Sequence, residues 1–433
     1  NLEKEDMYQI DGPLDMTVFF GFCGIKGYDH LRYPEAHPHS PWSMLELKRT
    51  PETNIFDMIR EKDLLIHLPY ESFDESVVNF LYSAANDKDV LAIKQTLYRV
   101  SSSSPVVQAL EKAVQNGKQV TVLMEVKARF DEANNILMAR RLEKAGAHVI
   151  YGLVGLKTHS KCTLVIRREK DGIRRYVHVA TGNYNASTAK LYTDLGILTC
   201  NDRFGIDASA FFNLLSGYSD PPIWDSFIVA PINLRQRCIE LIDREIHFAK
   251  NGEDAHMIAK MNSLLDKGII EKLYEASQAG VKIELIVRGI CVLIPGIPGA
   301  SDNITVRSIV GRFLEHSRIF WFRNGGREEL YISSADWMPR NLNDRVELMV
   351  PIEDPEIKRR LKQMVDIELS DNQKAHIMQA DGTWLKTISA ENQLCAQEYF
   401  QKIAEKRDAE DEMTLAQKLE PYTPVLGHGD GSD

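Results

Sequence analysis

The sequence contains no long apolar run. In 433 residues, no stretch approaches the roughly 20 consecutive apolar residues that a membrane-spanning helix needs. The opening residues, Asn1 to Asp6, have neither the basic end nor the apolar stretch of a signal peptide. They also lack an initiator methionine, so we expect the rear part of a longer protein.

Cysteine is scarce and scattered. The six cysteines form no CxxC pair, a spacing that predicts neither a zinc site nor a disulfide framework. We therefore expect a reducing, cytoplasmic setting.

Positive charge is also in deficit. The chain has 52 Lys and Arg against 62 Asp and Glu, a net charge of −10. This balance argues against a general nucleic-acid coat protein, and no nucleic-acid partner is expected. A polyanionic substrate would require positive charge focused in a cleft. The length itself is enough for two or three domains.

Helical and strand-like segments alternate along the first half of the chain. A helix is expected around residues 72–86, where Ser72 and Glu75 have the spacing of a capping box. The segments that follow alternate strand and helix: strand 90–98, helix 106–115, strand 120–126, helix 131–145 and strand 148–151. This order predicts a largely buried α/β sheet, with His148 packed in its core.

Part of this unit returns later in the chain. The segment LEKAVQNGKQVTVL at 110–123 matches LYEASQAGVKIELI at 273–286. At nearly the same spacing, His159-Ser160-Lys161 is echoed by His316-Ser317-Arg318, and each copy leads to a strand-like run and a small polar turn. We expect two homologous α/β domains. The expected divisions are 1–45, the end of a preceding domain and a linker; 46–226 and 227–405, the two α/β domains; and 406–433, an acidic, flexible tail.

The His-x-Lys pairs have the chemistry of a phosphoryl-transfer site. A histidine can attack phosphorus, and a lysine two residues on, on the same strand face, can hold the phosphoryl oxygens. A turn carrying asparagine can stabilise developing charge, and a second histidine can protonate the leaving group. The candidates are the nucleophile His159, the acid His316, and the phosphate-binding residues Lys161, Arg318, Asn183 and Asn185.

The His-x-Lys motif followed by Gly-x-x-Asn looks like a half-site of the phospholipase D superfamily, in which two half-sites face one active site. That superfamily places an Asp five residues after the Lys. Here the position holds Ile166, and the second copy has Arg323 at the same spacing. The departure argues against the usual hydrolase chemistry.

Longer strings point to one branch of that superfamily. They keep the order found in polyphosphate kinases and span nearly all of residues 50–355: LAIKQTLYRV (91–100), ARFDE (128–132), GLKTHSK (155–161), HVATGNYN (178–185), LYTD (191–194), VRGIC (287–291), FLEHSR (313–318) and SADWM (334–338). The sequence thus resembles the C-terminal part of the polyphosphate kinase family.

The resemblance implies two phospholipase D-like α/β domains facing one active site, preceded by the end of a head-type domain. It implies reversible transfer of the terminal phosphate of ATP to polyphosphate through a phosphohistidine on His159, with His316 as proton donor. Family positions that contact ATP match Tyr192, Arg288 and His316. Arg99 and Arg129 match residues beside Mg²⁺-bound phosphates, but a guanidinium has no lone pair with which to bind the metal.

The family also implies partners and a setting. These are ATP, ADP and inorganic polyphosphate as substrates, Mg²⁺ as cofactor, a homo-oligomer in the full-length protein, and peripheral association with the inner membrane. His178 matches a family segment considered for catalysis, although its apolar surroundings at 176–180 favour a supporting structural role.

Several alternatives remain open at this point. Asp194 and Glu347 follow the two turn signatures and either orient an imidazole or form surface salt bridges. Trp337 and residues 320–322 are expected in the core, and Gly325-Gly326 in a hairpin turn. Rival functions are a phospholipase D-type phosphodiesterase or nuclease and a non-catalytic polyanion-binding module with a decayed site. The intact residues His159, Lys161 and Asn185 argue against decay.

Overall fold

The computed structural model describes residues 3–45, 53–101, 103–128, 131–217 and 223–418. The chain divides into two units, residues 1–37 and 38–433. Arg129, one of the residues predicted beside the Mg²⁺-bound phosphates, lies outside the described residues, as does the predicted flexible end at 419–433. No helix within the described ranges is both long and apolar enough to cross a bilayer.

Within residues 3–37, the part of the first unit that the structure describes, the helical elements are all 3₁₀ helices. They are η1 (Lys4–Asp6), η2 (Met16–Gly24) and η3 (Asp29–Leu31). Among residues 3–37 no side chain is buried, and large apolar side chains such as Phe20 and Leu31 are exposed. That residues 1–45 are the end of a preceding domain and a linker stays a prediction.

The second unit begins with an eight-stranded sheet. Its main path runs in the order β1 (Leu64–Leu68), β8 (Tyr192–Thr199), β7 (Gly172–Ala180), β6 (Cys162–Glu169), β2 (Val90–Leu97), β3 (Gln119–Met124) and β4 (His148–Tyr151). β2, β3 and β4 are parallel, and the remaining neighbours in this path are antiparallel. The helical elements of this half are α2 (Ile55–Glu61), η5 (Asp74–Val78), α3 (Asn79–Asn86), α4 (Pro105–Gln115), α5 (Glu132–Ala145), η6 (Thr188–Lys190) and α6 (Asp202–Leu215).

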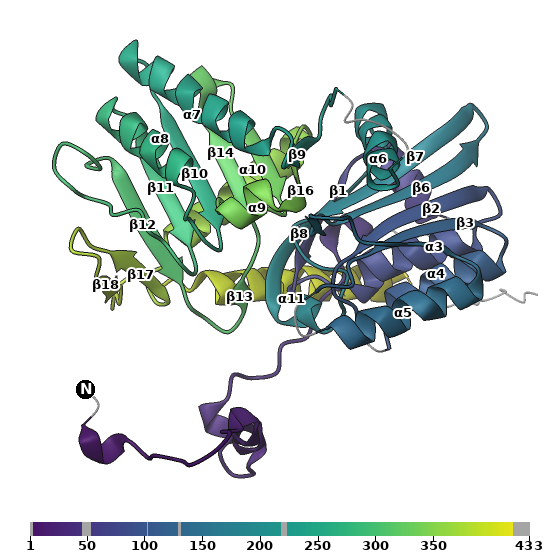
Figure 1. The fold of residues 1–433 in the computed structure, drawn as a ribbon, viewed down its shortest axis with the longest axis horizontal. Coiled ribbons are helices and arrows are strands. Elements are labelled where there is room, and N and C mark those ends of the chain that lie inside the picture. The colour runs from purple at the N-terminus through teal and green to yellow at the C-terminus, as the bar shows by residue number, and fades with distance from the viewer. Residues whose placement is uncertain (1–2, 46–52, 102, 129–130, 218–222, 419–433) are drawn as a thin grey trace, which may run out of the picture. The chain divides into compact units, whose positions relative to one another are not determined.

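A second sheet of ten strands follows. Its path is β18 (Trp384–Lys386), β17 (Ala375–Met378), β12 (Ile304–Ile309), β11 (Lys282–Val287), β10 (His256–Met261), β14 (Ile319–Phe322), β15 (Glu329–Ser333), β16 (Arg345–Pro351) and β5 (Lys157–Thr158), with β9 (Ile228–Ala230) paired to β16. Figure 1 shows α7 and α8 beside this sheet, and α3, α4 and α5 covering a face of the first one. The remaining helices are α7 (Leu234–Lys250), α8 (Lys267–Gln278), α9 (Pro339–Asn343), α10 (Pro355–Leu369) and α11 (Ala396–Lys418).

The two sheets share one strand order. Read from one edge, the first is β1-β8-β7-β6-β2-β3-β4, and the second contains β9-β16-β15-β14-β10-β11-β12. In each sheet, three neighbouring strands are parallel, β2-β3-β4 in the first and β10-β11-β12 in the second. The strands that follow on the side of β2 and of β10 are antiparallel. The shared strand order therefore confirms the expectation of two α/β domains with the same topology. The exact domain boundaries stay predictions.

Each half contributes a short strand that pairs with the sheet of the other half. β5, which precedes His159, pairs in parallel with β16 of the second half. β13 (Leu314–Glu315), which precedes His316, pairs in parallel with β8 of the first half. The two histidines are thus anchored on the sheets of the opposite halves.

Local sequence signals explain most element boundaries. Ser104 accepts a bond from the amide of Val107 at 3.3 Å, and Pro105 occupies the first turn of α4. Gly146 ends α5 at a φ of 105°, a conformation that glycine adopts without the clash of a Cβ. The strands and helices predicted between residues 90 and 151 are therefore confirmed, to within two residues at their ends.

Two local predictions were wrong or incomplete. His148 is exposed rather than in the core, because β4 is the edge strand of its sheet. At the predicted capping box, Ser72 Oγ does accept from the amide of Glu75 at 3.1 Å. The Glu75 carboxylate, however, accepts from Ser40 Oγ at 2.6 Å, while the Ser72 amide donates to the carbonyl of His39.

The C-terminal part confirms the other packing predictions. Trp337 is fully buried and stacks on Phe320 with ring centroids 4.8 Å apart. Gly325 and Gly326 lie in η7 (Asn324–Gly326), which joins the antiparallel strands β14 and β15. α11 begins at Ala396, whose amide donates to the Asp371 carboxylate at 2.7 Å.

Candidate active site

His159 is held by the backbone of the opposite half. The amides of His159 and Ser160 both donate to the carbonyl of Val346 in β16, each at 2.9 Å. The imidazole is buried, and its ring meets that of Tyr98 edge-on at 4.7 Å. Packing and backbone bonding together fix the position of the ring.

A carboxylate sets the orientation of that ring. Nδ1 of His159 lies 2.9 Å from Oε2 of Glu347, a side chain with no exposed surface. Glu347 also accepts from Ser334 Oγ at 2.5 Å and from Asn341 Nδ2 at 2.6 Å. A carboxylate with these donors acts as an acceptor, so Nδ1 carries the proton and Nε2 carries the lone pair.

The His159 ring is neutral in this environment. Burial, followed by the positive charges of Lys161 and Arg345, holds the pKa of His159 well below its usual value. A neutral imidazole keeps its Nε2 lone pair, which a nucleophile requires. No described residue donates a hydrogen bond to that nitrogen.

His316 has the mirror arrangement. Its amide donates to Thr193 Oγ1 at 3.2 Å, and its Nδ1 lies 2.8 Å and 3.0 Å from the two oxygens of Asp194. Asp194 also accepts from Thr181 Oγ1 at 2.6 Å. A Cβ on Gly182 would lie only 2.3 Å from the Asp194 carboxyl carbon, so only glycine leaves room for this carboxylate.

The far nitrogen of His316 is engaged, unlike that of His159. Nη1 of Arg318 lies 3.2 Å from Nε2 of His316 and can donate only to a deprotonated nitrogen. Burial lowers the pKa of His316; Asp194 acts to raise it and Arg318 to lower it. The ring is therefore neutral before substrate arrives.

The two pairs settle the alternatives for Asp194 and Glu347. Each carboxylate is buried and bonds an imidazole, so neither forms a surface salt bridge. Moreover, the pairs are crossed: Glu347 of the second half orients His159 of the first, and Asp194 of the first half orients His316 of the second. Neither half alone contains both members of either of these two pairs.

Lys161 is a buried cation beside His159. It is 2% exposed, its ammonium donates to the His159 carbonyl, and it lies 5.6 Å from the centre of the Tyr98 ring. Burial lowers the pKa of Lys161 to about 7, against the opposing effect of Glu347. Its charge near neutral pH therefore responds to any anion that enters the site.

A polar scaffold holds two further cations. Asp336 binds Arg318 through two bonds, Nε to Oδ1 at 3.1 Å and Nη2 to Oδ2 at 3.2 Å. The same carboxylate accepts from the amide of Asn262 at 2.8 Å. Asn262 Oδ1 in turn accepts from Nε and Nη2 of Arg288, at 3.1 Å and 2.9 Å. Arg288 and Arg318 are thus fixed through one network.

The structure describes Tyr192, which is predicted to contact ATP, and Arg99, which is predicted to lie beside Mg²⁺-bound phosphates. The Tyr192 ring lies 5.2 Å from the ring of His316. Arg99 pairs with Asp131 at 3.1 Å and lies over the ring of Tyr98, which itself contacts His159.

The sequence matches a known family. The family model described as polyphosphate kinase C-terminal domain 1 matches residues 54–221, and that of polyphosphate kinase C-terminal domain 2 matches residues 227–397. The chain belongs to the polyphosphate kinase family.

Individual members are similar over most of this chain. The polyphosphate kinase of Halalkalibacterium halodurans is 56% identical over 376 residues, covering 86% of this chain and 52% of its own length. That of Bacillus anthracis is 51% identical over 391 residues, covering 90% and 55%. The crystal structure of the Porphyromonas gingivalis polyphosphate kinase is 38% identical with a TM-score of 0.79, covering 88% of this chain and 57% of its own. The chain therefore spans about half the length of the curated polyphosphate kinases it matches.

The turn predicted to bind phosphate has two different asparagines. Asn185 Oδ1 accepts from the amides of Ser187 and Thr188, at 3.0 Å and 3.1 Å, just before and at the start of η6. Asn183 Oδ1 is buried, with no hydrogen-bond partner among the described residues. Of the two, Asn183 has the side chain available for a ligand, and both assignments stay predictions.

His178 has a supporting environment. It is 2% exposed, and its Nδ1 lies 2.8 Å from Tyr184 Oη, which accepts from Thr163 Oγ1 at 2.8 Å. Burial lowers the pKa of His178 to about 3, so the ring is neutral. These contacts favour the structural role over a catalytic one in this polyphosphate kinase family member.

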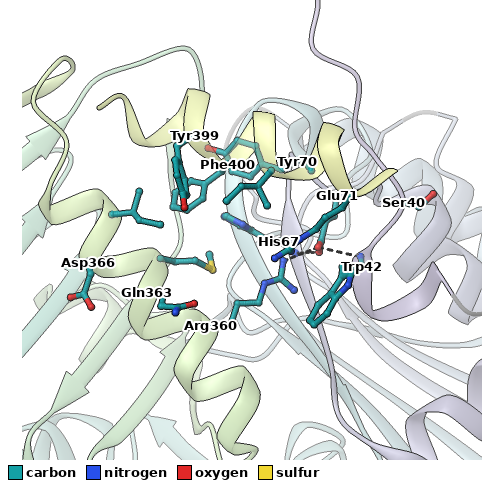
Figure 2. Close-up of a pocket in the computed structure, with 15 residues that line it drawn as sticks. Ser40, Trp42, His67, Tyr70, Glu71, Arg360, Gln363, Asp366, Tyr399 and Phe400 are labelled. Carbon is teal, nitrogen blue, oxygen red and sulfur yellow. Dashed lines mark hydrogen bonds and ion pairs between the residues drawn. The ribbon is translucent and has the colours of Figure 1, made fainter. Parts of the chain in front are cut away.

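A cavity of about 400 Å³ lies elsewhere in the unit, between the end of β1, α10 and α11. Figure 2 shows His67, Tyr70 and Phe400 around it, with Arg360 and Trp42 near Glu71. Arg360 pairs with Glu71 at 2.8 Å. Neither His159 nor His316 lines this cavity, so it is separate from the histidine site.

Proposed function

We propose that the protein to which this chain belongs transfers the terminal phosphate of ATP reversibly to polyphosphate through a phosphohistidine on His159. The observation that carries the proposal is the His159–Glu347 pair, with Nδ1 bonded at 2.9 Å and Nε2 bearing the lone pair. Membership of the polyphosphate kinase family supports the choice of substrates.

In the first step, Nε2 of His159 attacks the γ-phosphorus of ATP. The new N–P bond forms as the bond from that phosphorus to the β–γ bridging oxygen breaks, and ADP departs. In the second step a terminal oxygen of polyphosphate attacks the same phosphorus, the N–P bond breaks, and the chain gains one phosphate. Each step reverses by the same geometry.

His316 supplies and recovers the proton. Its neutral resting form, with Nε2 bonded to Arg318, is the form expected before substrate binds. Phosphate charge near the ring raises the pKa of His316, and Asp194 stabilises the imidazolium that results. Protonated Nε2 then donates to the leaving oxygen and takes the proton back in the reverse reaction.

The cations offset repulsion between the donor and acceptor phosphates. Lys161, Arg318 and Arg288 are buried or half-buried and held by named partners, so little reorganisation is needed when charge develops. Arg99 and Arg129 are proposed beside the β- and γ-phosphates, and Tyr192 beside the nucleotide.

Mg²⁺ is proposed to enter with the nucleotide. Within the described residues, no group of three or more His, Cys, Asp or Glu side chains could hold a metal ion. The charged side chains nearest the two histidines include Lys161 and Arg318, which cannot bind a metal ion. A metal ion at this site would therefore take its ligands from phosphate oxygens and water. When bound, the ion neutralises part of the phosphate charge.

The setting of the whole protein is also proposed. Six free cysteines support a reducing cytoplasm. Homo-oligomer formation and peripheral attachment to the inner membrane rest on the family resemblance alone. The domain limits 46–226 and 227–405 rest on the repeat in the sequence.

The test is synthesis and its reversal. The full-length protein, given γ-labelled ATP and Mg²⁺, should form labelled polyphosphate, and ADP with polyphosphate should yield ATP. His159→Ala should abolish both, whereas synthesis near the parent rate would overturn the assignment. A chromogenic phosphodiester hydrolysed without ATP would instead indicate the phosphodiesterase reading, against which the Ile166 position already argues.

A further inference from the structure

A buried charged cluster includes Glu315, the residue that immediately precedes His316. The Lys260 ammonium contacts Glu315 Oε2 at 2.7 Å and also the carboxylate of Glu368. The three side chains are 3%, 4% and 4% exposed and come from β10, β13 and α10. The proposed phosphotransfer chemistry uses none of them.

Gln397 of α11 fastens the short strand β13 to this cluster. Its Nε2 donates to Glu315 Oε1 at 2.6 Å and to the carbonyl of Phe313 at 2.9 Å. Its Oε1 accepts from the Phe313 amide at 3.0 Å. A two-residue strand has few hydrogen bonds of its own. Here the Gln397 side chain holds both Phe313, the residue before β13, and Glu315, its last residue.

The cluster connects to the catalytic pair through neighbouring residues. Thr193 and Glu315 face each other in the β8–β13 register, and each immediately precedes a member of the Asp194–His316 pair. Thr193 Oγ1 donates to Glu315 Oε2 at 2.8 Å and accepts from the His316 amide at 3.2 Å. A shift of the Glu315 carboxylate would therefore move both members of the pair.

The other histidine is supported differently, because the buried Glu125 carboxylate accepts from the Thr158 amide of β5 at 2.8 Å. Thr158 and Val346 occupy the equivalent positions before His159 and Glu347, and they pair in the β5–β16 register. Val346 is apolar, and the buried hydroxyl of Thr158 bonds no other described residue. The charged cluster is therefore specific to the His316 side of the site.

Stability alone does not account for these charges. Burial opposes the charge of Lys260, but the two glutamates raise the pKa of Lys260 above its usual value; burial raises the pKa of Glu368 to about 7. A buried ion cluster often stabilises a fold no better than apolar residues of similar volume would. The hydrogen bond from Thr193 to Glu315, which connects the cluster to the Asp194–His316 pair, provides a functional reason.

We infer that Lys260, Glu315, Glu368 and Gln397 are positioning residues that hold His316 against Asp194 for proton transfer. The role in proton transfer rests on the proposed function, whereas the contacts that position His316 are independent of it. The cluster fixes β13 on β8, and β13 fixes the imidazole.

The deciding measurement is nitrogen-15 NMR of histidine-labelled full-length protein. The His159–Glu347 and His316–Asp194 pairs each contain an Nδ1–H whose low-field proton resonance reports its hydrogen bond. In Glu315→Gln and Gln397→Leu, the His316 resonance should shift and broaden, while that of His159 stays unchanged as the internal control. Lys402→Ala, an exposed change on the same helix α11, should move neither.

Activity supplies the second readout. Both variants should slow His159 phosphorylation about tenfold, as partial loss of a general acid does, with the KM for ATP changed less than about twofold. Gln397→Leu leaves all three charges in place and decides the case if Glu315→Gln fails to fold. Unchanged His316 resonances in the folded variants, or equal shifts of both histidines, would overturn the inference. Loss of phosphotransfer in the parent protein would count against the proposed function only, since the resonances are measured without substrate.

Discussion

His159 and His316 share a pairing scheme at Nδ1 but differ at the other ring nitrogen, Nε2. Both bond a carboxylate through Nδ1. At Nε2, His316 faces the guanidinium of Arg318 at 3.2 Å, whereas no described residue donates to that nitrogen of His159. This asymmetry favours His159 as the nucleophile and His316 as the proton carrier.

Glu347→Gln tests the orientation of the nucleophile. An amide in place of the carboxylate can present its NH₂ to the ring and favour the wrong tautomer, with the lone pair on Nδ1. We expect the rate of His159 phosphorylation to fall at least about a hundredfold, measured in a single turnover with ATP. Glu271→Gln, on the exposed face of α8, should retain the parent rate. A Glu347→Gln rate within twofold of the parent would show that Glu347 does not set the tautomer.

Lys161 predicts a pH dependence of nucleotide binding. Burial lowers the pKa of Lys161 to about 7 in the empty site. The charged form is therefore present below this pH and is lost as pH rises through it, so ATP binding above pH 7 must take up a proton. The Kd for ATP should increase between about pH 6 and about pH 9, as measured by calorimetry in two buffers of different ionisation enthalpy. Lys161→Arg, which stays charged, should flatten that dependence; an unchanged slope would assign it to another group.

Residue identities were more predictable than residue partners. The motif spacing located His159, Lys161, His316 and Arg318, which the structure brings to one region. It left Asp194 and Glu347 undecided, because the bonds that decide them cross between halves. Asn262 was missed; its only signal is its place just after the parallel strand β10, the edge at which α/β folds gather their sites.

At the scale of elements, two very short strands carry the site. β5 and β13 comprise two residues each, and each places a histidine on the opposite sheet. No periodicity can be read from two residues, so the sequence could not predict them. The longer elements between 90 and 151 were predictable because capping residues and glycines mark their ends, while the error at His148 reflects an edge position that depends on the whole strand order.

The turn after β7 offers a test at this scale. In Gly182→Ala the new Cβ would meet the Asp194 carboxyl at 2.3 Å, so the carboxylate must move away from His316. We expect a loss of about 1–3 kcal/mol in the free energy of unfolding and a greater proportional loss of phosphorylation rate. Gly268→Ala is the matched control, since its Cβ would have an ordinary 3.6 Å contact on helix α8. Parent activity in Gly182→Ala would show that the Asp194 position is not critical.

At the scale of the whole molecule, the two halves are interlocked. The exchange of β5 and β13, together with the crossed pairs, makes each half dependent on the other. The sequence repeat predicted the duplication, but a repeat contains no information about which half a short strand joins. The net charge of −10 likewise hides the cations that the fold gathers around the histidines.

Interlocking predicts cooperative unfolding. Residues 54–397 should unfold in one calorimetric transition, with equal calorimetric and van't Hoff enthalpies, because neither sheet can open without releasing a strand of the other. Differential scanning calorimetry measures this directly. Two separate transitions assigned to the two halves would contradict the interlocked arrangement.

The central claim is that His159 carries the phosphoryl group, and intact-protein mass spectrometry at alkaline pH tests it most directly, because phosphohistidine survives base better than acid. The account predicts that the full-length protein mixed with ATP and Mg²⁺ gains one phosphoryl group. That gain should be absent in His159→Ala and should disappear when ADP or polyphosphate is added. A gain of the same size in His159→Ala, or none in the parent protein while it forms polyphosphate, would contradict the account.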